Sequence, residues 1–137
     1  MPFTAYKTVS DIVSKAVTSL KIVDNYLEST TLEFFFGVNK KVSISTLTKI
    51  LKPNSSVFKI ALARFLNEWG GTTLEVKTTN YFHDRFIIID DIEVWHLGPS
   101  LNTFGLKPAM ISNIQDAEIS KTIINIFNRE WGNASAI

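Results

Sequence analysis

The chain of 137 residues has a mass of 15.4 kDa, which suits one domain over 1–137, and its 45% hydrophobic and 20% charged residues are typical of globular proteins. Fourteen Lys and Arg against thirteen Asp and Glu leave a net charge of +1, so any anion site must be local rather than global. The absence of cysteine excludes disulfides and thiolate chemistry, and the absence of a long apolar run or a signal-peptide pattern predicts a cytoplasmic protein without a membrane partner.

Helical and extended patterns alternate over the first half of the chain. Ser10 is a suitable N-cap, and the apolar residues at helical spacing from there to Leu20 predict a short amphipathic helix. The segments that follow predict, in chain order, a strand over 20–24, a short helix over 28–36, a strand over 42–47, a loop over 52–56 and a long amphipathic helix over 58–69.

The second half is richer in extended segments. Short β-rich runs at 73–77, 86–90 and 94–97 predict three strands, and apolar residues at helical spacing over 119–130 predict a closing helix. The run at 86–90 is apolar up to its final aspartate, as expected for a strand covered on both faces. We therefore predict an α/β fold in which a mixed β-sheet is sandwiched between helices.

Several common catalytic patterns are absent. Neither a Walker A loop nor a GxGxxG turn occurs, and Asn102 stands where the serine-hydrolase pattern GxSxG needs its second glycine. The chain has only two histidines, His83 and His96, without HExxH spacing, which disfavours a zinc hydrolase. We expect no metal or other cofactor.

Glu75 and Lys77 lie on a predicted strand and match half of the pattern of metal-dependent nucleases, in which a carboxylate holds magnesium and a lysine orients water. That pattern also needs an upstream acidic residue, and no aspartate lies between Asp24 and Asp84. An exposed strand explains the pair more simply. A metal-dependent nuclease using Glu75 and Lys77 is therefore a lower-ranked alternative.

The segment from His83 to Asp90 combines an imidazole, a guanidinium and carboxylates within eight residues. His83 and Arg85 are separated by one residue, and in an extended chain such side chains project to the same side. Asp90 ends the strand, and a Gly-x-Ser-x-Asn segment at 98–102 follows the next one. Imidazole, guanidinium, hydroxyl and amide donors together suit a phosphate group.

These residues resemble the phospholipase D superfamily, whose signature is HxKxxxxD followed by a segment like G-S-x-N. His83, Arg85 and Asp90 match the first part, with Arg in place of Lys, and the segment at 98–102 matches the second with Pro99 inserted. The stretch at 20–29 is similar to the strand and turn that open such domains, so the resemblance covers most of the chain.

The resemblance implies a metal-independent phosphodiesterase. His83 would be the nucleophile that forms a phosphohistidine, Arg85 would neutralise the phosphate, and Asp90 completes the catalytic motif. The phosphate-binding residues implied are Ser100 and Asn102, with Lys107 as an additional positive charge just beyond the loop. A single motif supplies half a site, so the resemblance also implies a homodimer in which the partner's histidine is the general acid.

Nucleic acid is the favoured substrate, because the sequence has no amphipathic basic helix with which to bind a lipid surface. The alternative is a catalytically weak or inactive module that binds phosphate or nucleic acid and dimerises, in which Arg85 holds phosphate without cleavage. In either case the chain could be fused to, or associated with, another domain. Asp24 and Tyr26, after the first predicted strand, could line the rim of the pocket.

Overall fold

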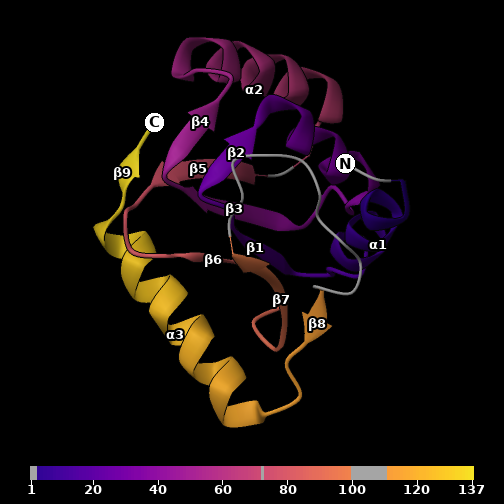
Figure 1. The fold of residues 1–137 in the computed structure, drawn as a ribbon. Helices are drawn as coiled ribbons and strands as arrows, with labels where there is room; N and C mark the ends of the chain where they lie inside the picture. The colour runs from indigo at the N-terminus through magenta and orange to yellow at the C-terminus, as the bar shows by residue number, and fades with distance from the viewer. Residues whose placement is uncertain (1–2, 72, 100–110) are drawn as a thin grey trace.

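The computed structural model describes residues 3–71, 73–99 and 111–137 (Figure 1). Its helices are α1 (Phe3–Val13), the 3-10 helix η1 (Ser29–Gly37), α2 (Ser55–Trp69) and α3 (Ala117–Asn133). Its strands are β1 (Ser19–Val23), β2 (Tyr26–Glu28), β3 (Ser43–Thr48), β4 (Ile50–Lys52), β5 (Thr73–Thr78), β6 (Asp84–Ile89), β7 (Glu93–Pro99), β8 (Ser112–Asn113) and β9 (Ser135–Ala136).

The strands form one large mixed sheet and one small one. The order in the large sheet is β8-β7-β6-β1-β3-β5-β9, with β1, β3 and β5 parallel and the other neighbouring pairs antiparallel. β2 and β4 pair separately in parallel. The consecutive strands β6 and β7 thus extend the sheet on the side of β1 away from β3.

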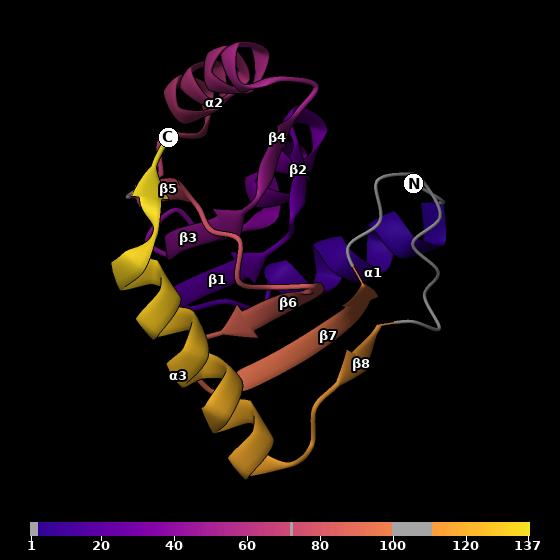
Figure 2. The ribbon, with the colours of Figure 1, turned by 60° about the vertical axis from the view of Figure 1, so that its left-hand side comes forward.

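Helices cover both faces of the large sheet. One hydrophobic cluster joins the sheet to α1, η1 and α2, and a second joins its other face to α3 (Figure 2). Ile87 and Ile89 of β6 belong to the first cluster, whereas Ile88 belongs to the second, so this strand is buried on both faces. The predicted α/β sandwich is confirmed.

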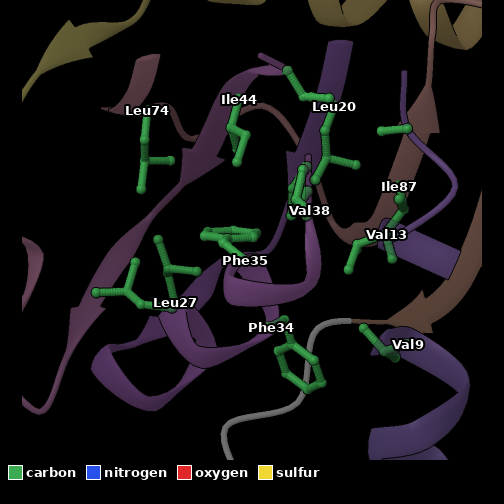
Figure 3. Packing of buried hydrophobic residues seen from close by; sticks show 14 of the residues in the cluster. Val9, Val13, Leu20, Leu27, Phe34, Phe35, Val38, Ile44, Leu74 and Ile87 are labelled. Atoms are coloured by element: carbon green, nitrogen blue, oxygen red, sulfur yellow. The ribbon is translucent and has the colours of Figure 1, made fainter. Parts of the chain in front are cut away.

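Aromatic side chains from η1 fill the larger cluster. Phe34 and Phe35 are buried, and Figure 3 shows Phe35 lying among Leu27 and Ile44, with Phe34 directed toward α1. The ring of Phe65 on α2 packs edge-on against Phe35, with 6.2 Å between the centroids. The short helix η1 therefore connects α1 to α2 over the face of the sheet.

The ends of the predicted helices have physical causes in the structure. Asn54 is the N-cap of α2 and accepts a hydrogen bond from the N–H of Val57 at 2.9 Å. α2 ends at Gly70, whose φ of +66° is in the left-handed region that glycine adopts most easily. Asp116 caps α3 by accepting bonds from the N–H groups of Glu118 and Ile119.

The first predicted helix was wrong in position. α1 ends at Val13, and the chain from residue 14 onward turns into β1. Val17, whose spacing suited the helical stripe, is 71% exposed, and its N–H donates to the Asp90 carboxylate at 3.0 Å. This contact with a distant residue overrides the local helical pattern. The short strands β2, β4, β8 and β9 were not predicted, and no helix of the described residues is long and apolar enough to cross a membrane.

Candidate functional site

The two parts of the predicted phosphate site lie next to each other at one end of β6 and β7. His83 is exposed immediately before β6, and Arg85 is half-buried as its second residue. In the antiparallel pairing of the strands, Asp84 lies opposite Pro99, the last residue of β7. The His-x-Arg segment and the start of the segment at 98–102 are therefore neighbours across the sheet.

Gly98 shapes the end of β7. It is buried and has a φ of +79°, a backbone conformation that favours glycine because it carries no Cβ. The glycine at the start of the Gly-x-Ser-x-Asn pattern thus has a conformational reason to be there. Ser100, Asn102 and Lys107, the predicted phosphate-binding residues, lie outside the described residues.

Arg85 lies with Asp24 in a small cavity between the sheet, α1 and η1, which we name the α1 cavity. Its volume is about 60 Å³, and its lining residues are Val9, Val13, Ile22, Val23, Asp24, Thr31, Phe34, Phe35, Arg85, Phe86, Ile87 and Leu97. Arg85 Nη2 donates to the carbonyl of Leu97 at 3.1 Å, and its buried Nε has no hydrogen-bond partner among the described residues. A guanidinium with an unused donor is suited to an anion.

Burial and charge act in opposite directions on Asp24 and Arg85. Burial raises the pKa of Asp24, against the effects of a hydrogen bond from the N–H of Tyr26 and of the positive charge of Arg85. Desolvation lowers the pKa of Arg85, and the negative charge of Asp24 opposes that shift. Asp24, at the end of β1, is thus one of the rim residues that the sequence indicated, whereas Tyr26 does not line this cavity.

His83 lines a different hollow, on the α3 side of the sheet, which we name the α3 groove. Its volume is about 320 Å³, and its lining residues are Tyr81, Phe82, His83, Asp84, Phe86, Ile123 and Ile126. The side chain of Asn25 donates a hydrogen bond to the carbonyl of Phe82 and so ties the segment before β6 to the end of β1.

Neither hollow is lined by both His83 and Arg85, which were expected to project to the same side. The expectation assumed an extended chain through both residues, but β6 begins only at Asp84, and its pairing with β7 shifts register between Asp84 and Phe86. His83 therefore precedes the regular part of the strand. Phe86 lines both the α1 cavity and the α3 groove.

The sequence did not predict that His96 and Asp84 interact. His96 Nε2 lies 2.9 Å from Asp84 Oδ2, and the His96 ring packs against Phe86 with 5.2 Å between centroids. His96 is half-buried on β7. The aspartate between His83 and Arg85 could have suggested such a partner, but the sequence does not specify cross-strand register.

Asp90, predicted as part of the catalytic motif, lies at the opposite end of β6 from His83. Its carboxylate accepts hydrogen bonds from the N–H groups of Val17, Thr18 and Ser19 and from the Thr18 hydroxyl. Desolvation is the largest single effect and raises its pKa, but these hydrogen bonds together outweigh desolvation and lower the pKa. Asp90 therefore fixes the start of β1 against the end of β6, and the structure does not bring it to the histidine.

Glu75 and Lys77, the residues of the metal-dependent alternative, lie on β5. Glu75 is exposed, and Lys77 Nζ lies 4.5 Å from the centroid of the Trp131 ring and 3.4 Å from the carbonyl of the same residue. Within the described ranges, no three His, Asp or Glu residues are grouped as metal ligands would be. Lys77 thus joins β5 to α3.

Two solved structures share this arrangement of sheet and helices. Among the solved structures, NucT from Helicobacter pylori matches with a TM-score of 0.66 and 13% identity, covering 98% of this chain and 91% of that one. TrmBL2, an archaeal chromatin protein whose structure shows a novel mode of DNA binding, matches with a TM-score of 0.64 and 16% identity over 98% of this chain. The match covers 51% of TrmBL2, so this chain spans about half of its length. No family model and no curated protein sequence matches the chain.

Proposed function

We propose that the chain is a metal-independent phosphodiesterase of the phospholipase D type that acts on nucleic acid. Its structural neighbours suggest a phospholipase D-like nuclease or a DNA-binding role. The observation that carries the proposal is the pairing of Asp84 with Pro99, which puts the His83-x-Arg85 segment beside the start of the segment at 98–102. We place the phosphate at this end of β6 and β7.

In the proposed reaction, a neutral imidazole nitrogen of His83 attacks phosphorus and forms an N–P bond while the bond to the leaving oxygen breaks. His83 of the partner subunit donates the proton that the leaving oxygen takes up. Water then attacks phosphorus while the partner's His83, now neutral, takes up its proton. The N–P bond breaks, which releases the phosphate product and restores both imidazoles to their starting states. Arg85 binds the phosphate oxygens, Ser100 and Asn102 help to hold them, and Lys107 adds an outer positive charge.

Asp90 takes a positioning role in this proposal rather than a direct one. Its hydrogen bonds to Thr18 and Ser19 hold β6 in register with β1, because both strands meet at that carboxylate. Asp24, in the α1 cavity with Arg85, supplies a negative charge that helps to keep the guanidinium in place when phosphate is absent.

Cleavage is expected to persist in EDTA. The proposed chemistry uses imidazole and guanidinium groups in place of a divalent cation. The measurement is the appearance of product from a fluorescent oligonucleotide, together with acid-quench isolation of the covalent intermediate. An acid-labile phosphohistidine on His83 is the expected adduct. Cleavage that requires added magnesium would contradict this mechanism and would favour the metal-dependent alternative, in which Glu75 and Lys77 act.

The active form is expected to be a symmetric homodimer, because one chain supplies one nucleophilic His83 and the leaving group needs a second acid. Light scattering at micromolar concentration is expected to give about twice the chain mass of 15.4 kDa. A cleaving species that remains a monomer would contradict the shared site.

A second candidate is a phosphate-binding or nucleic-acid-binding module without turnover. The observation that favours it is the substitution of Arg85 for the lysine of the phospholipase D signature, since a planar guanidinium binds phosphate well but differs in shape from an ammonium. The DNA binding of TrmBL2 agrees with such a role. Retained oligonucleotide binding without any cleavage or covalent adduct would select this candidate.

A further inference from the structure

The α3 groove contains an aromatic side chain that the proposed reaction does not use. Tyr81 is 47% exposed and lies two residues before His83. Its ring packs edge-on against Phe82 with 5.1 Å between centroids, and the Arg129 guanidinium lies 4.9 Å from its centroid. Its N–H lies 3.3 Å from Thr79 Oγ1 as a hydrogen-bond donor. Tyr81 is thus an exposed ring that is held in place from several sides.

The α3 groove has one aromatic wall and one aliphatic wall. Phe82 is buried against α3, and its ring packs edge-on against that of Phe86, with 6.4 Å between centroids. These two rings form the aromatic wall together with Tyr81. Ile123 and Ile126 of α3 form the aliphatic wall. The volume of this hollow, about 320 Å³, is in the size range of sites for small organic groups.

His83 lines the same hollow, together with Asp84, whose carboxylate lies 2.9 Å from His96 Nε2. A group that enters the groove would therefore lie beside the phosphorus atom that His83 attacks. In nucleic acid, each phosphate is flanked by nucleosides, whose bases are flat rings that stack on tyrosine. A paired base is held inside a duplex, so only an unpaired base can enter a groove of this kind.

We propose that the α3 groove is a binding subsite for an unpaired nucleobase next to the reacting phosphate, with Tyr81 as the stacking residue. This inference rests on the proposed function, since it assigns the groove to the substrate of His83. Arg129 supports it from α3, because its guanidinium contacts the Tyr81 ring and is itself held by an ion pair with Glu130 at 3.0 Å.

The test compares two fluorescein-labelled strands of equal length, oligothymidylate and a strand of abasic phosphodiester units. We expect the full chain to bind oligothymidylate more tightly in fluorescence anisotropy. Tyr81→Ala is expected to weaken that binding about 5- to 150-fold, as for the loss of one stacked base, and to leave binding of the abasic strand unchanged. Tyr81→Phe keeps the ring and is expected to restore most of the difference.

Phe36→Ala is the matched control, because Phe36 is 51% exposed and packs against Phe65 in a different hollow, between η1 and α2. This variant is expected to bind both strands like the unmodified chain. Equal binding of both strands by the unmodified chain, with cleavage intact, would overturn the subsite and leave the proposed function standing. Loss of oligothymidylate binding in Phe36→Ala equal to that in Tyr81→Ala would also overturn it. If the chain binds and cleaves neither strand, the proposed function itself fails.

Discussion

His83→Ala is expected to lower kcat/KM for phosphodiester cleavage by at least about 10³-fold, because it removes the group that forms the covalent intermediate. His83 is exposed and precedes β6, so its removal leaves the core unchanged, and the free energy of unfolding is expected to stay close to that of the unmodified chain. The measurements are steady-state cleavage of a fluorescent oligonucleotide and a thermal melting curve. The covalent adduct is expected to disappear with the activity.

His96→Ala is the matched control for this experiment. His96 interacts with Asp84 at 2.9 Å on the neighbouring strand, and both side chains are partly exposed, so the loss of this pair costs little stability. We expect the variant to keep most of its activity. A loss as large as that of His83→Ala would instead identify His96 as the general acid within one chain, and a dimer would not be needed to complete the site.

Arg85→Ala is expected to raise the Kd for inorganic phosphate about 5- to 150-fold, corresponding to a loss of about 1 to 3 kcal/mol for a charge-assisted contact. The basis is the Arg85 guanidinium, which the proposed mechanism assigns to the phosphate oxygens and whose buried Nε has no hydrogen-bond partner among the described residues. Isothermal titration with phosphate measures the effect. Unchanged binding would place the anion elsewhere.

Arg85→Lys adds a pH dependence to that test. Desolvation lowers the pKa of Arg85 against the opposing charge of Asp24, and a lysine in its place starts from a lower pKa than an arginine. Phosphate binding by the lysine variant is therefore expected to weaken as pH rises toward the pKa of the lysine, whereas binding by the unmodified chain stays steady over the same range. Arg64→Ala, which changes an exposed arginine beside a different hollow, is expected to bind phosphate normally.

Most of the fold was predictable because its segments carry strong periodic patterns. The strand at 86–90 is apolar on consecutive positions, and β6 is indeed buried on both faces. The helix over 58–69 begins a few residues earlier than predicted, at Ser55, because Asn54 caps it. The two-residue strands β8 and β9 were not predictable, since such short segments carry no periodicity and exist only through pairing with β7 and β5.

The placement of the candidate residues was only partly predictable from the sequence. The sequence indicated Asp24 as a rim residue, and Asp24 does line the cavity that contains Arg85. The spacing of His83 and Arg85 did not reveal that they line different hollows, because the strand boundary and the register shift at Asp84 depend on β7. Nothing in the sequence singled out Tyr81, since its contact with Arg129 of α3 depends on tertiary packing.

The contacts of the Asp90 carboxylate affect the order in which parts of the chain fold. Together with the pairing of β6 with β1, the carboxylate joins two segments about 70 residues apart, so the histidine segment acquires its place only when a long loop has closed. Before that closure, β6 and β7 form only a hairpin, and an isolated hairpin is marginally stable in water. The N-terminal strand is therefore a folding template for the phosphate-binding end of the sheet, although it contributes neither His83 nor Arg85.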